Sequence, residues 1–175
     1  MIDFHRVTTR RGDNGTSTIF GGKRWRKDHA VFDVLGTVDE LTAWLGVVRS
    51  AILELAAGEE ARQIEAIQKD LFRLGSEVAA AQGSKALGSQ NVLGNGDVER
   101  IEMWEKALMK MVELPSDFVI PGATLTSSYI DVARTVTRRL ERVYVSVKRK
   151  NSLVYLNRLS DYLYILARHF DNGQI

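Results

Sequence analysis

Residues 31–55 read VFDVLGTVDELTAWLGVVRSAILEL, and the spacing of their apolar side chains indicates the fold class. These side chains recur in alternating steps of three and four residues, the spacing that places them on one side of a helix. The stripe consists of Val31, Val34, Val38, Leu41, Leu45, Val48, Ile52 and Leu55. Such steps also favour shallow left-handed packing against neighbouring helices. The stretch therefore predicts a long helix with one buried face inside a helical bundle.

The same periodicity continues beyond this stretch. A second stripe covers residues 64–81, and Gly58 separates it from the first, so we expect an antiparallel helical hairpin. Residues 82–96 read QGSKALGSQNVLGNG, a composition typical of a loop. Asp97 is then the predicted N-cap of a third, shorter helix that ends at residues 114–115.

Two further helices are predicted in the C-terminal part. Residues 118–122 (FVIPG) form a short apolar connector whose proline and glycine resist helix formation. A fourth helix carries apolar residues between positions 133 and 147 and closes on the basic run 148–150, where positive charge suits the helix dipole. A fifth helix carries regularly spaced leucines over residues 153–170. No strand alternation of any length is present.

These patterns predict an all-α protein with a single domain over residues 1–175. A bundle of five helices over residues 29–175 follows a structured arm over residues 1–28. The chain has 45% hydrophobic and 26% charged residues, which is ordinary for a folded protein of this length. No apolar run approaches the length of a membrane span, and no secretory signal is visible, so we expect a cytoplasmic protein without a membrane partner.

Composition also excludes several kinds of chemistry. The net charge of +2 gives no reason to expect a nucleic-acid partner, although a basic helical scaffold remains an alternative. The absence of cysteine excludes disulfides, zinc-thiolate sites and thiol nucleophiles. The three histidines, His5, His29 and His169, are scattered and none belongs to the E-x-x-H pair of a di-iron bundle. We predict no protein-held metal cluster.

The arm contains an unusual run, TTRRGDNGTSTIFGGKR, over residues 8–24. Its glycines let backbone amides approach an anion, and its hydroxyls and basic side chains add donors and positive charge. It matches neither the Walker pattern nor the dinucleotide G-x-G-x-x-G pattern. Two interpretations stay open on composition alone: a loop that holds a polyphosphate, with Asp13 beside a magnesium ion, and a glycine-rich surface arm with solvated charges.

Two clusters on the predicted helices carry charge. Asp39 and Glu40 flank the buried stripe of the first helix, so at least one carboxylate lies near its edge and requires a cationic partner or water. Arg134, Arg138 and Arg142 recur every four residues on one face of the fourth helix. Aligned guanidinium groups suit phosphate or carboxylate ligands. A solvated basic face is the alternative.

The fifth helix carries a polar row along one flank. Its members are Asn157, Asp161, Tyr164 and Arg168. The asparagine could hydrogen-bond a ribose or an adenine edge. The row could equally supply hydrogen bonds between helices.

Together, these stretches resemble one known family, the PduO-type ATP:cob(I)alamin adenosyltransferases. Five family motifs are found in order along nearly the whole chain. They are TRRGDNGTS (residues 9–17), GTVDEL (36–41), FVIPG (118–122), RTVTRRLER (134–142) and YLNRLSD (155–161). The chain departs from the usual family pattern at Leu35, Thr42 and Ala123. These departures bear on the surfaces expected to meet the corrinoid and the nucleotide.

The resemblance implies a ferritin-like bundle that assembles as a homotrimer, with active sites between subunits. The arm would wrap ATP and Mg²⁺, with the nucleotide lined by Thr9, Arg10, Gly12, Asp13, Gly15, Thr16, Ser17 and Lys27. Arg138 would contact the phosphates and Asn157 the nucleoside. Asp39 would pair with Arg134 across the subunit boundary, and Glu141 would support the arginine cluster. Phe118 would lie on the lower face of the corrin ring.

The activity implied is transfer of the 5′-deoxyadenosyl group of ATP to the cobalt of cob(I)alamin. This reaction requires no side-chain nucleophile, which agrees with the lack of cysteine. Cob(I)alamin would come from a separate flavin or cobalamin reductase, and an adenosylcobalamin-dependent enzyme would be the acceptor of the product. The alternative is a bundle that binds ATP and corrinoid without catalysis, as a carrier or sensor.

Overall fold

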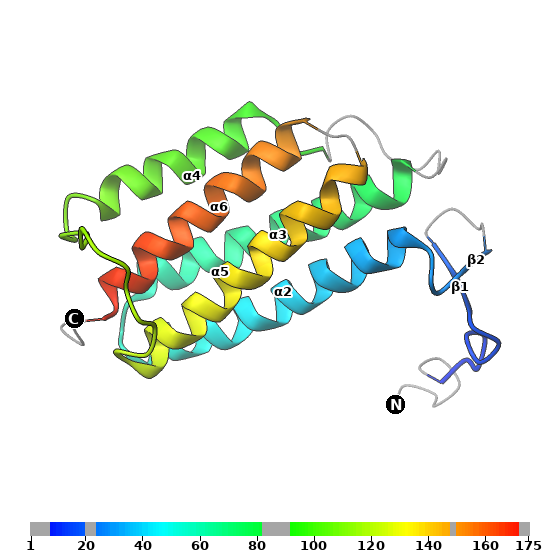
Figure 1. Ribbon diagram of the computed structural model, residues 1–175, viewed down its shortest axis with the longest axis horizontal. Coiled ribbons are helices and arrows are strands. Elements are labelled where there is room, and N and C mark those ends of the chain that lie inside the picture. Colours follow the sequence, from blue (N-terminus) through cyan, green and yellow to red (C-terminus); the bar gives the residue numbers. More distant parts are fainter. Residues whose placement is uncertain (1–7, 20–23, 82–91, 148–149, 172–175) are drawn as a thin grey trace.

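The computed structural model describes residues 8–19, 24–81, 92–147 and 150–171, which form five long helices preceded by a short two-stranded sheet (Figure 1). In chain order the elements are β1 (Thr16–Thr18), β2 (Arg24–Arg26), α2 (Ala30–Glu54), α3 (Gly58–Ala81), α4 (Asn95–Leu108), α5 (Leu125–Tyr144), the 3₁₀ turn η2 (Val145–Val147) and α6 (Lys150–His169). The all-α bundle predicted from apolar spacing is thereby confirmed.

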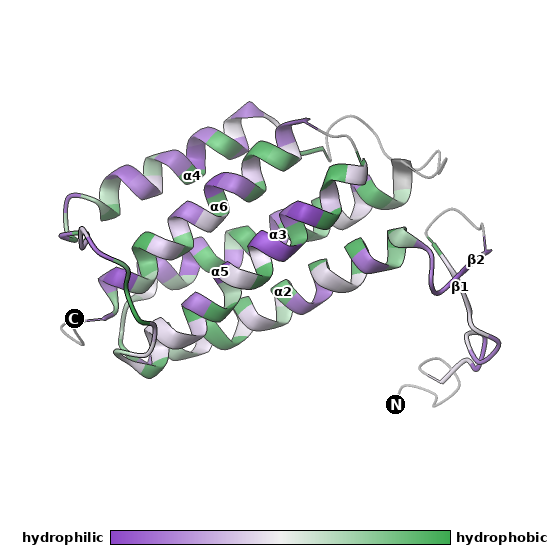
Figure 2. Ribbon diagram, in the orientation of Figure 1, coloured by the Kyte–Doolittle hydropathy of each residue, from purple (hydrophilic) through white to green (hydrophobic). Residues whose placement is uncertain are grey.

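The helices pack in the order that their connections predict. The hairpin of α2 and α3 forms as expected, α5 lies against both α2 and α6, and α4 packs on α6 at the outside of the bundle (Figure 1). Each long helix carries both hydrophobic and hydrophilic residues along its length, as a helix with one buried side does (Figure 2). None of the described helices has a stretch long and apolar enough to cross a lipid bilayer.

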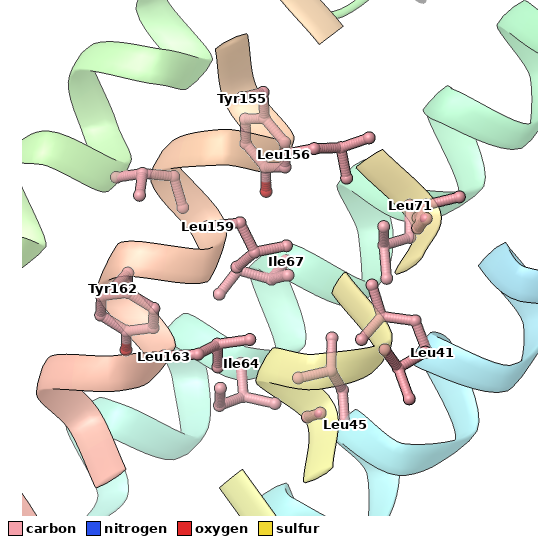
Figure 3. Close-up of a cluster of buried hydrophobic side chains, with 14 of the residues drawn as sticks. Leu41, Leu45, Ile64, Ile67, Leu71, Tyr155, Leu156, Leu159, Tyr162 and Leu163 are labelled. Atoms are coloured by element: carbon pink, nitrogen blue, oxygen red, sulfur yellow. The ribbon is translucent and has the colours of Figure 1, made fainter. Parts of the chain in front are cut away.

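The core consists of the predicted stripes. In α2 the stripe positions from Val31 to Ile52 are buried, and Leu55 is exposed because the helix has ended before it. Side chains from α2, α3 and α6 converge in the cluster of Figure 3, which includes Leu41, Leu45, Ile64, Ile67, Leu71, Leu156, Leu159 and Leu163. Burial of this many apolar side chains is the main stabilising term of the fold.

Side chains determine where several helices begin. His29 precedes α2, and its Nδ1 accepts a hydrogen bond from the Val31 amide at 3.3 Å. Thr124 caps α5 by accepting from the Ser127 amide at 3.0 Å, while Ser127 Oγ accepts from the Thr124 amide at 3.1 Å. This reciprocal pair satisfies amides that have no partner inside the helix. Thr124 Oγ1 also donates to the Phe170 carbonyl at 2.9 Å, which ties the start of α5 to the end of α6.

The structure corrects two predicted boundaries. The predicted N-cap Asp97 lies inside α4, where its Oδ2 accepts from the Gly94 amide at 2.9 Å; the extended backbone of Gly94 begins the helix instead. The same helix ends at Leu108, earlier than predicted, and turns follow it.

The prediction that a basic run closes the fourth helix is also wrong. The α-helix α5 ends at Tyr144 and tightens into η2, and Lys150 is the first residue of α6. The lysine therefore lies at a helix start, where its charge does not complement the dipole. Two residues of the predicted basic run, 148–149, lie outside the described residues. So do residues 82–91 of the predicted loop.

The arm and the connector lie at opposite ends of the bundle. The arm precedes the start of α2, whereas the connector over residues 109–124 leads from α4 into the start of α5, at the other end (Figure 1). A helix of the 20 residues of α5 is about 30 Å long. Within one chain, these two segments therefore cannot contact one small ligand together.

Candidate active site

The arm is ordered by hydrogen bonds among its own residues. Strands β1 and β2 pair antiparallel, with Thr16 opposite Arg26 and Thr18 opposite Arg24. Gly15 adopts a positive φ of 74°, which favours glycine, and its amide donates to the Gly12 carbonyl at 3.2 Å. The predicted arm is thus a tight turn followed by a short hairpin.

Lys27 lies over the turn. Its amide donates to the Gly15 carbonyl at 2.9 Å, and its ammonium is so close to Gly12 that a Cβ added there would lie 3.0 Å from Nζ. Glycine at position 12 therefore leaves room for the cation above the turn. Asp13 is exposed beside it, and Thr9 and Arg10 are exposed at the entry to the turn. The arm thus places a lysine ammonium, a carboxylate and backbone amides within one turn, a donor set that suits a phosphate with a hydrated cation.

The connector forms a cleft at the other end of the bundle. The cleft has a volume of about 540 Å³ and is lined by Pro115, Ser116, Asp117, Phe118, Val119, Pro121, Arg134, Tyr164 and Arg168. Phe118 is fully exposed and Ile120 nearly so, and Leu125 is also exposed at the start of α5. An exposed apolar patch of this kind is typical of a surface that a ligand or another protein covers.

Two arginines of the cleft share one aspartate. Asp131 is buried and accepts from Arg134 Nε at 2.8 Å and from Arg168 Nη2 at 2.6 Å. Both guanidinium groups also lie over the ring of Tyr164, at 6.0 Å for Arg134 and 5.3 Å for Arg168. Arg134 therefore has a partner within its own chain, and the pairing of Arg134 with Asp39 of a neighbouring subunit stays a prediction.

The three arginines of the row on α5 differ in how far they are exposed. Arg138 and Arg142 are exposed, whereas Arg134 is partly buried at the cleft. Beside them, Arg139 forms an ion pair with Glu40 of α2. Glu40 is thus the carboxylate of the GTVDEL motif that pairs within the chain, and Asp39 is exposed.

The structure brings together Glu141 and Asn157. Asn157 Nδ2 on α6 donates to Glu141 Oε1 on α5 at 3.1 Å. Asn157 Oδ1 accepts from Arg158 Nη1 at 3.1 Å, and Arg158 Nε donates to Glu102 of α4 at 2.8 Å. The polar row on α6 therefore supplies interhelical hydrogen bonds, and these fix the orientation of the Asn157 amide.

The predicted site residues fall into three groups, of which the arm and the cleft lie apart within one chain. The arm carries the predicted nucleotide residues, the cleft carries Phe118 with Arg134, and the pair of Glu141 with Asn157 lies on facing helices α5 and α6. The structure does not join the arm to the cleft (Figure 1).

Sequence reasoning missed some residues of these groups. Arg24 and Asn14 organise the arm, and Asp131 supports the cleft by accepting from Arg168, which the predicted polar row had included. Arg24 was visible only as one charge among many, whereas the spacing of Asp131 from Arg134, one helical turn, was an available signal.

Glu105, an acidic side chain on α4, has a raised pKa. Burial raises the pKa of Glu105 on α4 to about 7, and the neighbouring carboxylates Asp161 and Glu102 add to the shift against the opposing charge of Arg158. The buried Oε1 of Glu105 accepts no hydrogen bond from the described residues. The α4–α6 interface thus contains a carboxyl group that titrates near neutral pH.

The chain thus combines a five-helix bundle with a glycine- and threonine-rich arm and an exposed apolar connector. The family model described as cobalamin adenosyltransferase matches residues 7–170. The chain therefore belongs to the cobalamin adenosyltransferase family, and the resemblance found in the five motifs is confirmed.

Curated relatives agree with this assignment. The chain is 40% identical to a corrinoid adenosyltransferase of Citrobacter freundii, with 94% of each chain covered. It is 36% identical to the corrinoid adenosyltransferase PduO of Salmonella typhimurium, and it spans about half of that relative's length. It is 32% identical to the human corrinoid adenosyltransferase MMAB over 94% of this chain and 68% of the relative.

Solved structures show the same fold. A variant of the PduO-type ATP:corrinoid adenosyltransferase from Lactobacillus reuteri, complexed with cobalamin and ATP, superposes with a TM-score of 0.85 at 29% identity, covering 95% of this chain and 91% of that one. A second variant of that enzyme, complexed with ATP, superposes with a TM-score of 0.79 at 30% identity, covering 94% of this chain and 93% of that one.

Proposed function

We propose that this protein transfers the 5′-deoxyadenosyl group of ATP to the cobalt of cob(I)alamin, giving adenosylcobalamin and triphosphate. The observation that carries the proposal is the combination, on one chain of this family, of an anion-suited arm and a fully exposed Phe118 beside a cleft. The related enzyme with cobalamin and ATP bound supports both substrates.

In this proposal the arm holds the triphosphate. Lys27 lies above the turn of Gly12 and Gly15, and Asp13 lies beside them. Thr9, Arg10, Thr16 and Ser17 complete the loop around the nucleotide. The described residues contain no group of three or more metal-binding side chains. A magnesium ion would therefore be held chiefly by phosphate oxygens, with Asp13 as its protein partner, and would neutralise phosphate charge.

The chemical step is a displacement at the C5′ carbon of ATP. The electron pair of Co(I) forms the Co–C bond, the C5′–O bond breaks, and triphosphate leaves with the bonding pair. Negative charge accumulates on the triphosphate, so cations placed there lower the barrier. Arg138 and Lys27 supply that charge in the proposal. No general base takes part, because no proton is removed from carbon, and positioning of the two substrates carries most of the acceleration.

The connector would control the lower face of the corrinoid. Phe118, Val119 and Pro121 present apolar surface there. Such a surface offers no ligand to cobalt and leaves no polar partner for water. It would therefore favour the four-coordinate Co(II) state, which is easier to reduce. The electron itself comes from a separate flavin or cobalamin reductase.

The site would be completed by two subunits. The arm and the connector lie at opposite ends of one chain, so an ATP held by the arm can reach a corrinoid held at the connector only when these segments belong to different subunits (Figure 1). A closed homotrimer with three shared sites satisfies this requirement. In such an assembly Asp39, which is exposed in the single chain, would pair with Arg134 of the adjacent subunit.

The test is an anaerobic assay with protein, Mg-ATP and chemically reduced cobalamin. We expect the spectrum of the Co–C product to grow within minutes and triphosphate to be released in equal amount. Binding of ATP without formation of the Co–C product would contradict catalysis and would favour a carrier or sensor. Release of ADP or pyrophosphate in place of triphosphate would contradict the displacement at C5′.

A further inference from the structure

We propose that Arg24 is a positioning residue, which holds the nucleotide arm in its binding conformation before ATP arrives. The inference rests on the proposed function of the arm. It concerns a residue outside the nine-residue TRRGDNGTS motif.

Arg24 joins three separate positions of the arm. Its Nε and Nη2 atoms donate to Thr16 Oγ1 at 2.9 Å and 2.7 Å. Nη2 also donates to Asn14 Oδ1 at 3.2 Å and to the carbonyl oxygen of Arg11. One planar guanidinium group on β2 thus connects both sides of the turn that precedes β1.

These contacts use the hydrogen-bonding capacity of Thr16. The Thr16 hydroxyl accepts from Arg24 and donates its hydrogen to Asn14 Oδ1 at 2.7 Å, and the Thr16 amide also donates to Asn14 Oδ1 at 3.3 Å. A hydroxyl has only one hydrogen to donate. In this conformation Thr16 therefore has none left for a phosphate, and it serves the site by shaping the loop.

An ordered loop lowers the cost of binding. Fixing a residue's backbone costs conformational entropy, so a glycine-rich turn that must be ordered by its ligand binds more weakly than one already ordered. The turn contains Gly12 and Gly15, which are the residues with most freedom to lose. Removal of Arg24 should thus weaken ATP binding while leaving the chemical step almost unchanged once ATP is bound.

Arg26 provides a matched control. It lies on the same strand, two residues away, carries the same charge, is exposed and pairs with Asp28 at 2.6 Å, without a contact to the turn among its described hydrogen bonds. If the arginines act only by attracting triphosphate, Arg24→Ala and Arg26→Ala will have equal effects. If Arg24 orders the turn, only Arg24→Ala will have a large effect.

The experiment measures the Kd for Mg-ATP by calorimetry, together with KM and kcat of adenosyl transfer, for the parent and the variants. We expect Arg24→Ala to raise Kd and KM for ATP by about tenfold or more, since hydrogen bonds from a charged donor are lost, with kcat within about threefold. Arg26→Ala should change Kd by less than about twofold. Arg24→Lys should restore little, because an ammonium lacks the planar fork that reaches several acceptors.

A double-mutant cycle tests the connection to Asn14. Because both side chains act through one network, Asn14→Ala should add less than about twofold to the Kd of Arg24→Ala.

Equal effects of Arg24→Ala and Arg26→Ala, or full restoration by Arg24→Lys, would overturn the inference and leave the proposed function standing. A fall in kcat with unchanged Kd would also overturn it, because Arg24 would then act on the leaving group. A parent protein that binds no ATP would overturn both proposals.

Discussion

Asn157 on α6 and Glu141 on α5 form a direct hydrogen bond of 3.1 Å, with the asparagine amide as donor and the glutamate as acceptor. Because Asn157 Oδ1 accepts from Arg158, the orientation of its amide is fixed from both sides. One N–H and one lone pair of the amide remain for another partner. Glu141, predicted as support for the arginine cluster, therefore orients the residue proposed to contact the nucleoside.

The first prediction concerns this hydrogen bond. Glu141→Ala should raise KM for ATP by about tenfold, because the Asn157 amide loses its acceptor and a partly buried donor is left without one. Glu141→Gln keeps an acceptor and should retain most of the affinity. Steady-state kinetics at varied ATP measure this. Equal losses in the two variants would show that the charge of Glu141 is what matters, and not the orientation of Asn157.

The second prediction concerns the leaving group. Arg138→Ala should lower kcat by at least about a hundredfold, because one cation that stabilises departing triphosphate is removed. The fold should be unaffected, since Arg138 is exposed on α5. Far-ultraviolet circular dichroism checks the fold, and Arg62→Ala, which removes an exposed arginine on α3, serves as the control. Substantial remaining turnover would refute the role of Arg138.

The third prediction concerns the corrinoid face. Phe118→Ala should slow reduction of Co(II) in the site by about tenfold and change the Kd for ATP by less than about twofold, because apolar surface is removed at one substrate only. Phe118→Leu keeps most of that surface, so its rate of Co(II) reduction should lie between those of the parent and Phe118→Ala. The rate of Co(I) formation, followed by absorbance with a chemical reductant, measures the effect. Equal effects on both substrates would indicate that Phe118 only packs.

The fourth prediction concerns pH. The pKa of Glu105 is about 7 in the folded protein, above its usual value of 4.5, so the folded state binds this proton more tightly than the unfolded chain does. Its contribution to stability is complete below pH 4.5 and is lost as pH rises to 7. The side chain of Glu105→Gln stays neutral at every pH. The free energy of unfolding of this variant, minus that of the parent, should therefore rise by about 1–2 kcal/mol between pH 4.5 and pH 8, after allowance for solvent screening.

Urea unfolding at several pH values measures this difference. Glu99→Gln, an exposed change on the same helix, is the control and should leave the pH dependence of the parent unchanged. A difference between Glu105→Gln and the parent that does not vary with pH would show that Glu105 ionises normally.

The helical fold was predictable because it depends on local periodicity. Every position of the first stripe from Val31 to Ile52 is buried, and so are the stripe positions of α3 from Ile64 to Val78 and those of the last helix from Leu156 onward. The helix ends were less predictable, because they depend on particular caps. Gly94 replaced Asp97 as the start of α4, and the chain tightened into η2 after Tyr144.

The side-chain partners could be predicted only in part. Motif order identified the family, but the partner of a charged residue depends on tertiary contacts that one sequence does not display. Asp70 is an example. It is buried on α3, accepts from Tyr155 of α6 at 2.8 Å and pairs with Arg100 of α4 at 2.5 Å, which joins three helices. No periodic pattern distinguishes this aspartate from an exposed one.

In the proposed assembly, each site takes its arm from one subunit and its connector from another. Mixing two inactive variants tests this sharing of sites. Asp13→Ala damages the arm, and Phe118→Asp damages the apolar connector. Each variant is unfolded and refolded alone, and the two are also refolded together in equal amounts. Shared sites predict recovery of about a quarter of the parent's rate of adenosylcobalamin formation in the mixture, from sites that combine an intact arm with an intact connector. No recovery in mixed assemblies would contradict the claim.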